Sequence, residues 1–191
     1  MEIGVFKTIS EYQKDIENLE EMPYFHFGEP LNYKKIKNLS LFYNRFTPKH
    51  NIKILVKTLE YFCEVNNIPT LTLEISNGEK DNPAHYVLGK DVIYIDESLL
   101  KSSYWYALYL LCHELSHHLI YIDNNMNNTL MDLSHEFKEK YAINKDNNLL
   151  LPIELAANSL NHYLLKDIEK KTGNFFLSWL DKFNLEKSKL F

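Results

Sequence analysis

The sequence predicts an α+β fold that is mostly helical and contains a small three-stranded antiparallel sheet. Three short runs with strand-like patterning lie together in the middle of the chain. Stretches with helical patterning precede and follow them, so helices and strands are segregated along the sequence. This segregation is typical of α+β proteins.

The first part of the chain is predicted to be helical. A helix is expected over Ile9–Met22, where Pro23 closes it. An irregular segment follows, and a second helix begins at Pro48, because proline is favoured in the first helical turn. This helix extends to about Asn66, since its apolar residues keep helical spacing: Ile52, Val56, Leu59 and Cys63.

The three strands are expected in the middle of the chain. Thr70–Ile75 alternates apolar and polar residues, which indicates a strand with one buried face. Ala84–Leu88 and Val92–Ile95 are two more apolar runs. The short segment Gly89-Lys90-Asp91 between them is typical of a hairpin connection.

Helical patterning returns at Ser102 and continues through Tyr121. Two Asn-rich stretches, Asn124–Asn128 and Asn144–Asn148, are predicted to be loops, because Asn competes for backbone hydrogen bonds and tolerates turn geometry. Further helices are expected over Thr129–Ala142, Pro152–Lys166 and Phe175–Leu185.

Length and composition indicate one soluble domain over residues 1–191, and the helical patterning places an N-terminal helical part at 1–68. The net charge of −5 argues against direct nucleic-acid binding. Two cysteines cannot supply a disulfide scaffold or a four-cysteine zinc site. Neither a secretory signal nor a membrane-spanning apolar run is visible, so we expect a cytoplasmic protein.

The predicted helix at 102–121 contains the pattern His113-Glu114-x-x-His117. Its two imidazoles stand one turn apart on one helix face, which lets both bind a single Zn²⁺. Glu114 is offset by one residue, so its carboxylate would lie beside the metal and accept a proton from water. The helix is strongly apolar, and burial of these groups costs several kcal/mol unless a metal compensates them. The alternative is a polar helix edge that only faces solvent.

A catalytic zinc site needs a third protein ligand and an open fourth position. The metzincin pattern would require His and Gly where this chain has Asp123 and Ile120. Among the later glutamates, only Glu154 has an Asp or Asn four residues on, namely Asn158. We therefore expect Glu154 to bind zinc and Asn158 to support a histidine ligand by hydrogen bonding. His135 is the alternative third ligand, and a solvated surface Glu154 is the other possibility.

Together these residues resemble the ImmA/IrrE family of zinc peptidases. The resemblance rests on His113–His117, on Glu154 followed by Ala157-Asn158 and Leu164-Leu165, and on the preceding stretch Val92–Leu99. It spans about Ala84 to Lys166 and implies that the core of the domain is 84–166. It also implies a zincin-like domain of the gluzincin type, with the sheet packed on the motif helix. The family pattern is not followed at His118 or at Ser159-Leu160, so the substrate does not carry over.

The resemblance implies a zinc-dependent endopeptidase that cleaves a protein, such as a helix-turn-helix repressor of a mobile element or stress response. The alternative is a zinc-binding regulatory module that cuts nothing. His118 points away from the His117 face, and Cys112 reads as a small buried apolar residue. The residue that would stabilise an oxyanion stays open between these three: Tyr121, His162 and Tyr163.

A run of basic residues with no acidic one precedes the sheet. Lys49, Lys53 and Lys57 share one face of the second predicted helix. A solvated surface is the simplest interpretation, and docking of an acidic partner or of DNA bound by a repressor substrate is the alternative. The run consists of Lys34, Lys35, Lys37, Arg45, Lys49, Lys53 and Lys57.

Overall fold

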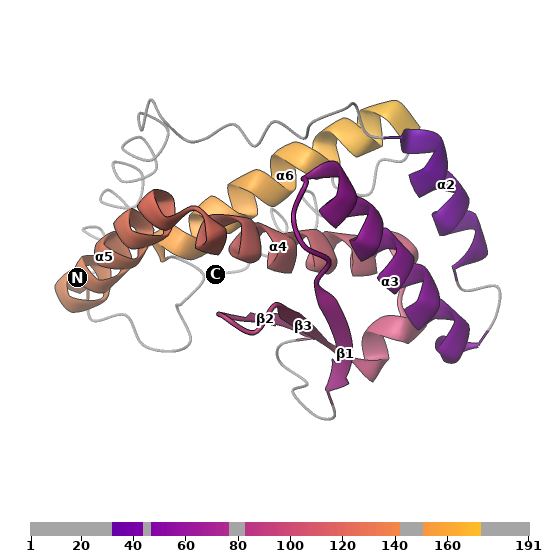
Figure 1. Ribbon diagram of the computed structural model, residues 1–191, viewed down its shortest axis with the longest axis horizontal. Coiled ribbons are helices and arrows are strands. Elements are labelled where there is room, and N and C mark those ends of the chain that lie inside the picture. The colour runs from indigo at the N-terminus through magenta and orange to yellow at the C-terminus, as the bar shows by residue number, and fades with distance from the viewer. Residues whose placement is uncertain (1–31, 44–46, 77–82, 142–150, 173–191) are drawn as a thin grey trace, which may run out of the picture.

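The computed structural model describes residues 32–43, 47–76, 83–141 and 151–172. Six helical segments and three strands follow one another in this part of the chain (Figure 1). They are α2 (Tyr33–Phe42), α3 (Pro48–Val65), β1 (Thr72–Ser76), β2 (Ala84–Val87), β3 (Val92–Asp96), the 3₁₀ helix η1 (Glu97–Lys101), α4 (Tyr104–Ile122), α5 (Asn124–Tyr141) and α6 (Pro152–Thr172). The α+β prediction is confirmed.

Helix α4 lies between the sheet and α6 (Figure 1). Its start is defined by Ser103, whose hydroxyl accepts a hydrogen bond from the Tyr106 N–H at 3.2 Å. Of its 19 residues, 11 are buried. Contacts on several sides explain why the sequence around the His-Glu motif is apolar, since α4 has little surface left for solvent.

The sheet is mixed, which corrects the prediction that all three strands are antiparallel. Its order is β1-β3-β2, with β3 antiparallel to β2 and parallel to β1. The short turn at 88–91 forces β2 and β3 to be antiparallel neighbours. β1 pairs with the other side of β3, so it is not next to β2. Apolar alternation predicts which face of a strand is buried, but it specifies neither neighbour nor direction.

Two helical regions differ from the prediction. α2 lies in the segment predicted to be irregular, where the Asn32 side chain caps it by accepting from the Lys35 N–H at 3.0 Å. α5 begins at Asn124, inside the stretch predicted to be a loop. The Asp123 carboxylate caps α5 by accepting from the Met126 N–H at 3.1 Å, and this cap outweighs the weak helix propensity of the asparagines. The other predictions at 9–22, 144–148 and 175–185 lie outside the described residues.

Two apolar clusters hold these elements together. The larger one joins α2, α3, the sheet, α4 and the far half of α6. The smaller one joins the end of α4 to α5 and the first turns of α6, where Ala156 and Ala157 are completely buried. Small side chains at this contact let α6 approach α4 closely. No helix in the described ranges has both the length and the apolar character needed to cross a membrane.

Candidate metal centre

Helix α4 presents His113 and His117 on the face that α6 covers. The two rings stand one turn apart, and their Nε2 atoms are 3.2 Å from each other. Only 13% of the His113 side chain and 15% of the His117 side chain are exposed. The i, i+4 spacing therefore directs two imidazole nitrogens to one point between the helices.

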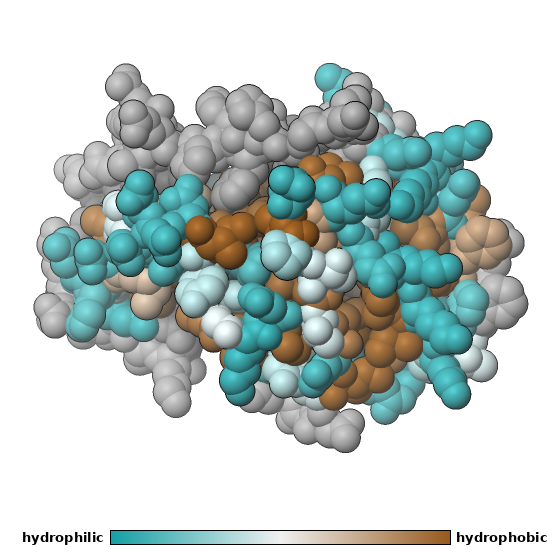
Figure 2. Space-filling view, viewed as in Figure 1, coloured by the Kyte–Doolittle hydropathy of each residue, from teal (hydrophilic) through white to brown (hydrophobic). Residues whose placement is uncertain are grey.

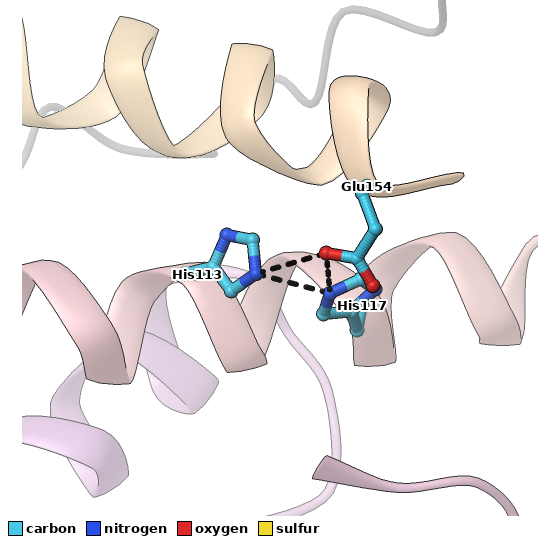
Figure 3. A group of neighbouring side chains, drawn as sticks. All are labelled: His113, His117 and Glu154. Atoms are coloured by element: carbon cyan, nitrogen blue, oxygen red, sulfur yellow. Dashed lines mark hydrogen bonds and ion pairs between the residues drawn. The ribbon is translucent and has the colours of Figure 1, made fainter. Parts of the chain in front are cut away.

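Glu154 reaches the same point from the first turn of α6 (Figure 3). Its Oε2 atom lies 3.4 Å from His113 Nε2 and 3.3 Å from His117 Nε2. Burial of the carboxylate opposes ionisation, but hydrogen bonds and charges of the two histidines outweigh it and lower the Glu154 pKa to about 2. Glu154 is thus anionic at neutral pH, as a metal ligand must be.

These three residues form a group that could hold a metal ion. A tetrahedral ion with ligands about 2.0–2.1 Å away, as zinc has, separates neighbouring ligand atoms by about 3.3–3.4 Å. The observed separations of 3.2, 3.3 and 3.4 Å match the edges of such a tetrahedron. Two imidazoles and one carboxylate also leave the fourth position for water or substrate. The residues therefore fit a metal of this kind.

Glu114 lies beside this group but points to the sheet. Its Oε2 accepts a hydrogen bond from the backbone N–H of Tyr86 on β2, at 2.7 Å. The residue is only 7% exposed. Burial raises the Glu114 pKa to about 7, while the charge of His113 and the Tyr86 hydrogen bond partly oppose the shift. A carboxylate with this pKa is poised to exchange protons near neutral pH.

Asn158 is half-buried on α6 and makes no hydrogen bond to either histidine among the described residues. Asn161, one turn further along, is fully buried and donates to the Tyr109 carbonyl at 3.1 Å. In the described part of the chain, Asn161 Oδ1 and His113 Nδ1 are both buried without a hydrogen-bond partner. Sequence reasoning missed Asn161, although it lies seven residues after Glu154 and hence near the same helix face.

The other histidines near the motif do not join the group. His135 is exposed on α5 and is not among the ligand atoms that lie within 4.8 Å of one another. His118 is buried against the sheet, where its Nδ1 lies 3.0 Å from the Tyr86 hydroxyl. Tyr86 therefore contacts α4 through both its backbone N–H and its side chain. Sequence reasoning did not single out Tyr86, because nothing in its local pattern marks it.

The three candidates for stabilising an oxyanion differ in position. Tyr121 is half-buried near Tyr86, with ring centroids 6.4 Å apart, and His162 is exposed on α6. The side chain of Tyr163 lies outside the described residues. Cys112 is buried, as expected, and burial raises its pKa.

No family model, curated protein or solved structure matches this chain. Residues and geometry alone therefore carry the functional argument. Three side chains on two packed helices could hold a metal ion, and a buried carboxylate lies one residue after the first histidine. That carboxylate accepts a hydrogen bond from strand β2, which is at the edge of the sheet formed by the described residues.

Proposed function

We propose that this chain is a zinc-dependent endopeptidase. The observation that carries the proposal is the near-equilateral triangle formed by the ligand atoms of His113, His117 and Glu154, with the buried carboxylate of Glu114 beside it. Zinc is favoured because two imidazoles, one carboxylate and a tetrahedral spacing are typical of catalytic zinc sites.

The bound ion would acidify water and polarise the carbonyl of the scissile peptide bond. Glu114 would accept the proton from water and later deliver it to the leaving amine. The Tyr86 N–H holds one carboxylate oxygen of Glu114, which leaves the other oxygen for proton transfer. Burial keeps competing water away from this carboxylate. His113, His117 and Glu154 would orient the ion, and Asn158 remains the predicted supporting residue.

Strand β2 supplies a place for an extended substrate. Among the described residues it is an edge strand, with β3 on one side only. The Asp96 N–H bonds to the Pro83 carbonyl, so the alternation of antiparallel pairs turns the backbone groups of Ala84 and Tyr86 away from β3. The Tyr86 N–H donates to Glu114 rather than to β3, which agrees with this orientation. A substrate strand added at Ala84 would therefore lie next to the catalytic carboxylate.

The resemblance to the ImmA/IrrE family suggests the class of the substrate, whereas its identity does not carry over. We propose a protein, of the class of helix-turn-helix repressors, which would require the chain to act in the cytoplasm. A zinc-binding module without proteolysis is the other function that the same ligands would support. Metal content alone does not separate the two, because both functions need the same three ligands.

Removal of the metal tests the proposed function directly. We expect the chelator-treated protein to lose cleavage of a candidate repressor and to regain it when Zn²⁺ is restored, because the ion would lower the pKa of the attacking water. Cleavage would be followed by mass spectrometry of the products. Magnesium added back in place of zinc serves as the control, since Mg²⁺ prefers octahedral oxygen sites. Full cleavage by the metal-free protein would contradict the proposal.

The basic residues on α3 provide a second test, which asks whether they take part in binding the substrate. Lys49, Lys53 and Lys57 are exposed, and Figure 2 shows hydrophilic side chains over the α2–α3 side of this face. We expect the variant with all three changed to Gln to keep wild-type zinc content and cleavage, because they lie on a different helix from every ligand. Cleavage would be measured from about 50 to 300 mM salt, which varies the screening length roughly twofold.

A different result would indicate a docking surface. Long-range attraction between exposed charges raises encounter rates and is screened by salt. If the three lysines dock an acidic partner, the variant should cleave more slowly at low salt, and its deficit should shrink as salt rises. That outcome would contradict our expectation that the lysines only face solvent.

A further inference from the structure

The residue at the capping position of α6 is apolar and cannot cap the first turn with its side chain. The carbonyl of Leu151 accepts the first hydrogen bond of this helix, from Leu155 N–H at 2.9 Å, so Leu151 holds the capping position. Its side chain has no oxygen to cap the exposed N–H groups. Pro152 has no N–H at all. The next N–H belongs to Ile153, and the residue after it is Glu154.

A serine from another helix accepts a hydrogen bond from the Ile153 N–H. The Ser134 Oγ atom on α5 accepts from the Ile153 N–H at 3.3 Å and donates to the Leu130 carbonyl at 2.6 Å. Ser134 is buried, with 5% of the residue exposed. The hydrogen bond to the Leu130 carbonyl fixes the orientation of the hydroxyl on α5. The Ser134 oxygen therefore acts as a helix cap for α6, although it belongs to α5.

The apolar packing around this bond connects it to the metal ligands. Ile153 belongs to the small cluster that holds α5 and α6 against the end of α4. The hydrogen bond from Ser134 therefore fixes the start of α6 in the same layer that brings Glu154 over His113 and His117. A shift at the helix start would move the Glu154 carboxylate away from the two imidazoles.

We infer that Ser134 is a positioning residue for the metal ligand Glu154, acting through the first turn of α6. The inference rests on one part of the proposed function, namely that Glu154 binds a metal ion. It requires neither proteolysis nor any particular substrate.

Replacement of the hydroxyl is the test. Ser134→Ala should raise the zinc dissociation constant about tenfold, the low end of the loss seen when residues that orient metal ligands are changed. The visible absorption of Co²⁺ bound in place of zinc should also change, because it reports the ligand geometry. Ser159→Ala is the matched control, because the Ser159 hydroxyl donates to the Leu155 carbonyl of its own helix, at 2.8 Å, and to no other group in the described part of the chain. Zinc affinity should stay at the wild-type value.

Two further variants keep the result decisive if Ser134→Ala does not fold. Ser134→Thr retains the hydroxyl, so it should preserve zinc affinity and the Co²⁺ spectrum. Ser134→Val has the shape of the Thr variant but no hydroxyl, so its zinc affinity should fall and its Co²⁺ spectrum should change. Equal zinc affinity in Thr and Val variants, or wild-type affinity in a folded Ala variant, would overturn the inference. A wild-type protein that binds no zinc would overturn it as well. Loss of affinity without proteolysis by the wild type would support the inference and contradict the proposed function.

Discussion

Glu114→Gln should leave the fold and the zinc content unchanged and should lower proteolysis by about 10²-fold or more. The amide has the size of the carboxylate, and its carbonyl oxygen still accepts the hydrogen bond from the Tyr86 N–H. It cannot accept the proton that water must lose. The change also removes a buried charge, so we expect no loss of thermal stability.

Three measurements on the same preparation check this expectation: substrate cleavage, zinc content by elemental analysis, and thermal unfolding. Glu97→Gln is the control, because Glu97 is exposed and, among the described residues, forms an ion pair with Lys101 alone, at 3.3 Å. It should cleave like the wild type. Near wild-type proteolysis by Glu114→Gln would end the general-base assignment. If the wild type and Glu114→Gln both bind zinc but neither cleaves any repressor, a zinc-binding regulatory module becomes the better description of the chain.

Local patterns predicted most of the fold that surrounds the site. The helix at 102–121 and the strand pair at 84–88 and 92–95 agree with α4, β2 and β3 within one or two residues. These elements have strong apolar periodicity or a short turn, and both are local properties. The direction of β1 was not predictable in this way, because it depends on which side of β3 the strand pairs with.

The predicted helix starts at Pro48 and Pro152 agree with α3 and α6, whereas the start of α5 was not predicted. Asn124–Asn128 is poor in helix formers, yet the Asp123 cap and contacts with α6 and α4 make it helical. Pro152 marks the start of α6 in the sequence, but the side chain that accepts from the Ile153 N–H belongs to Ser134, 19 residues earlier. A sequence window contains the first type of cap but not the second.

In the candidate site, too, local sequence spacing predicted some residues, whereas others depend on packing between distant segments. His113, His117 and Glu154 were found because motif spacing and a partner four residues on are visible in the chain, and the structure brings their ligand atoms together. Tyr86 and Asn161 were not found. Their contacts with α4 join positions 28 and 52 residues apart, and only the packing of the sheet and α6 on that helix creates them.

Glu154→Ala should weaken zinc binding by more than the roughly 100-fold that the loss of a ligand-orienting residue costs, because it removes a ligand itself. Two histidines one turn apart would remain, without the anionic oxygen that completes the triangle. We therefore expect substoichiometric zinc after dialysis. The rise in melting temperature that zinc gives the wild type should also disappear, since a ligand stabilises the folded state only when it binds it.

His135→Ala separates the two possible third ligands. His135 is exposed on α5 and lies outside the group formed by His113, His117 and Glu154, so this variant should keep full zinc content and the zinc-dependent rise in melting temperature. Elemental analysis and calorimetry on both variants would decide the matter. Full zinc occupancy in Glu154→Ala, together with its loss in His135→Ala, would reverse the ligand assignment. Because α6 contributes Glu154 and α5 contributes His135, the reversed result would also mean that α5 rather than α6 closes the site over α4.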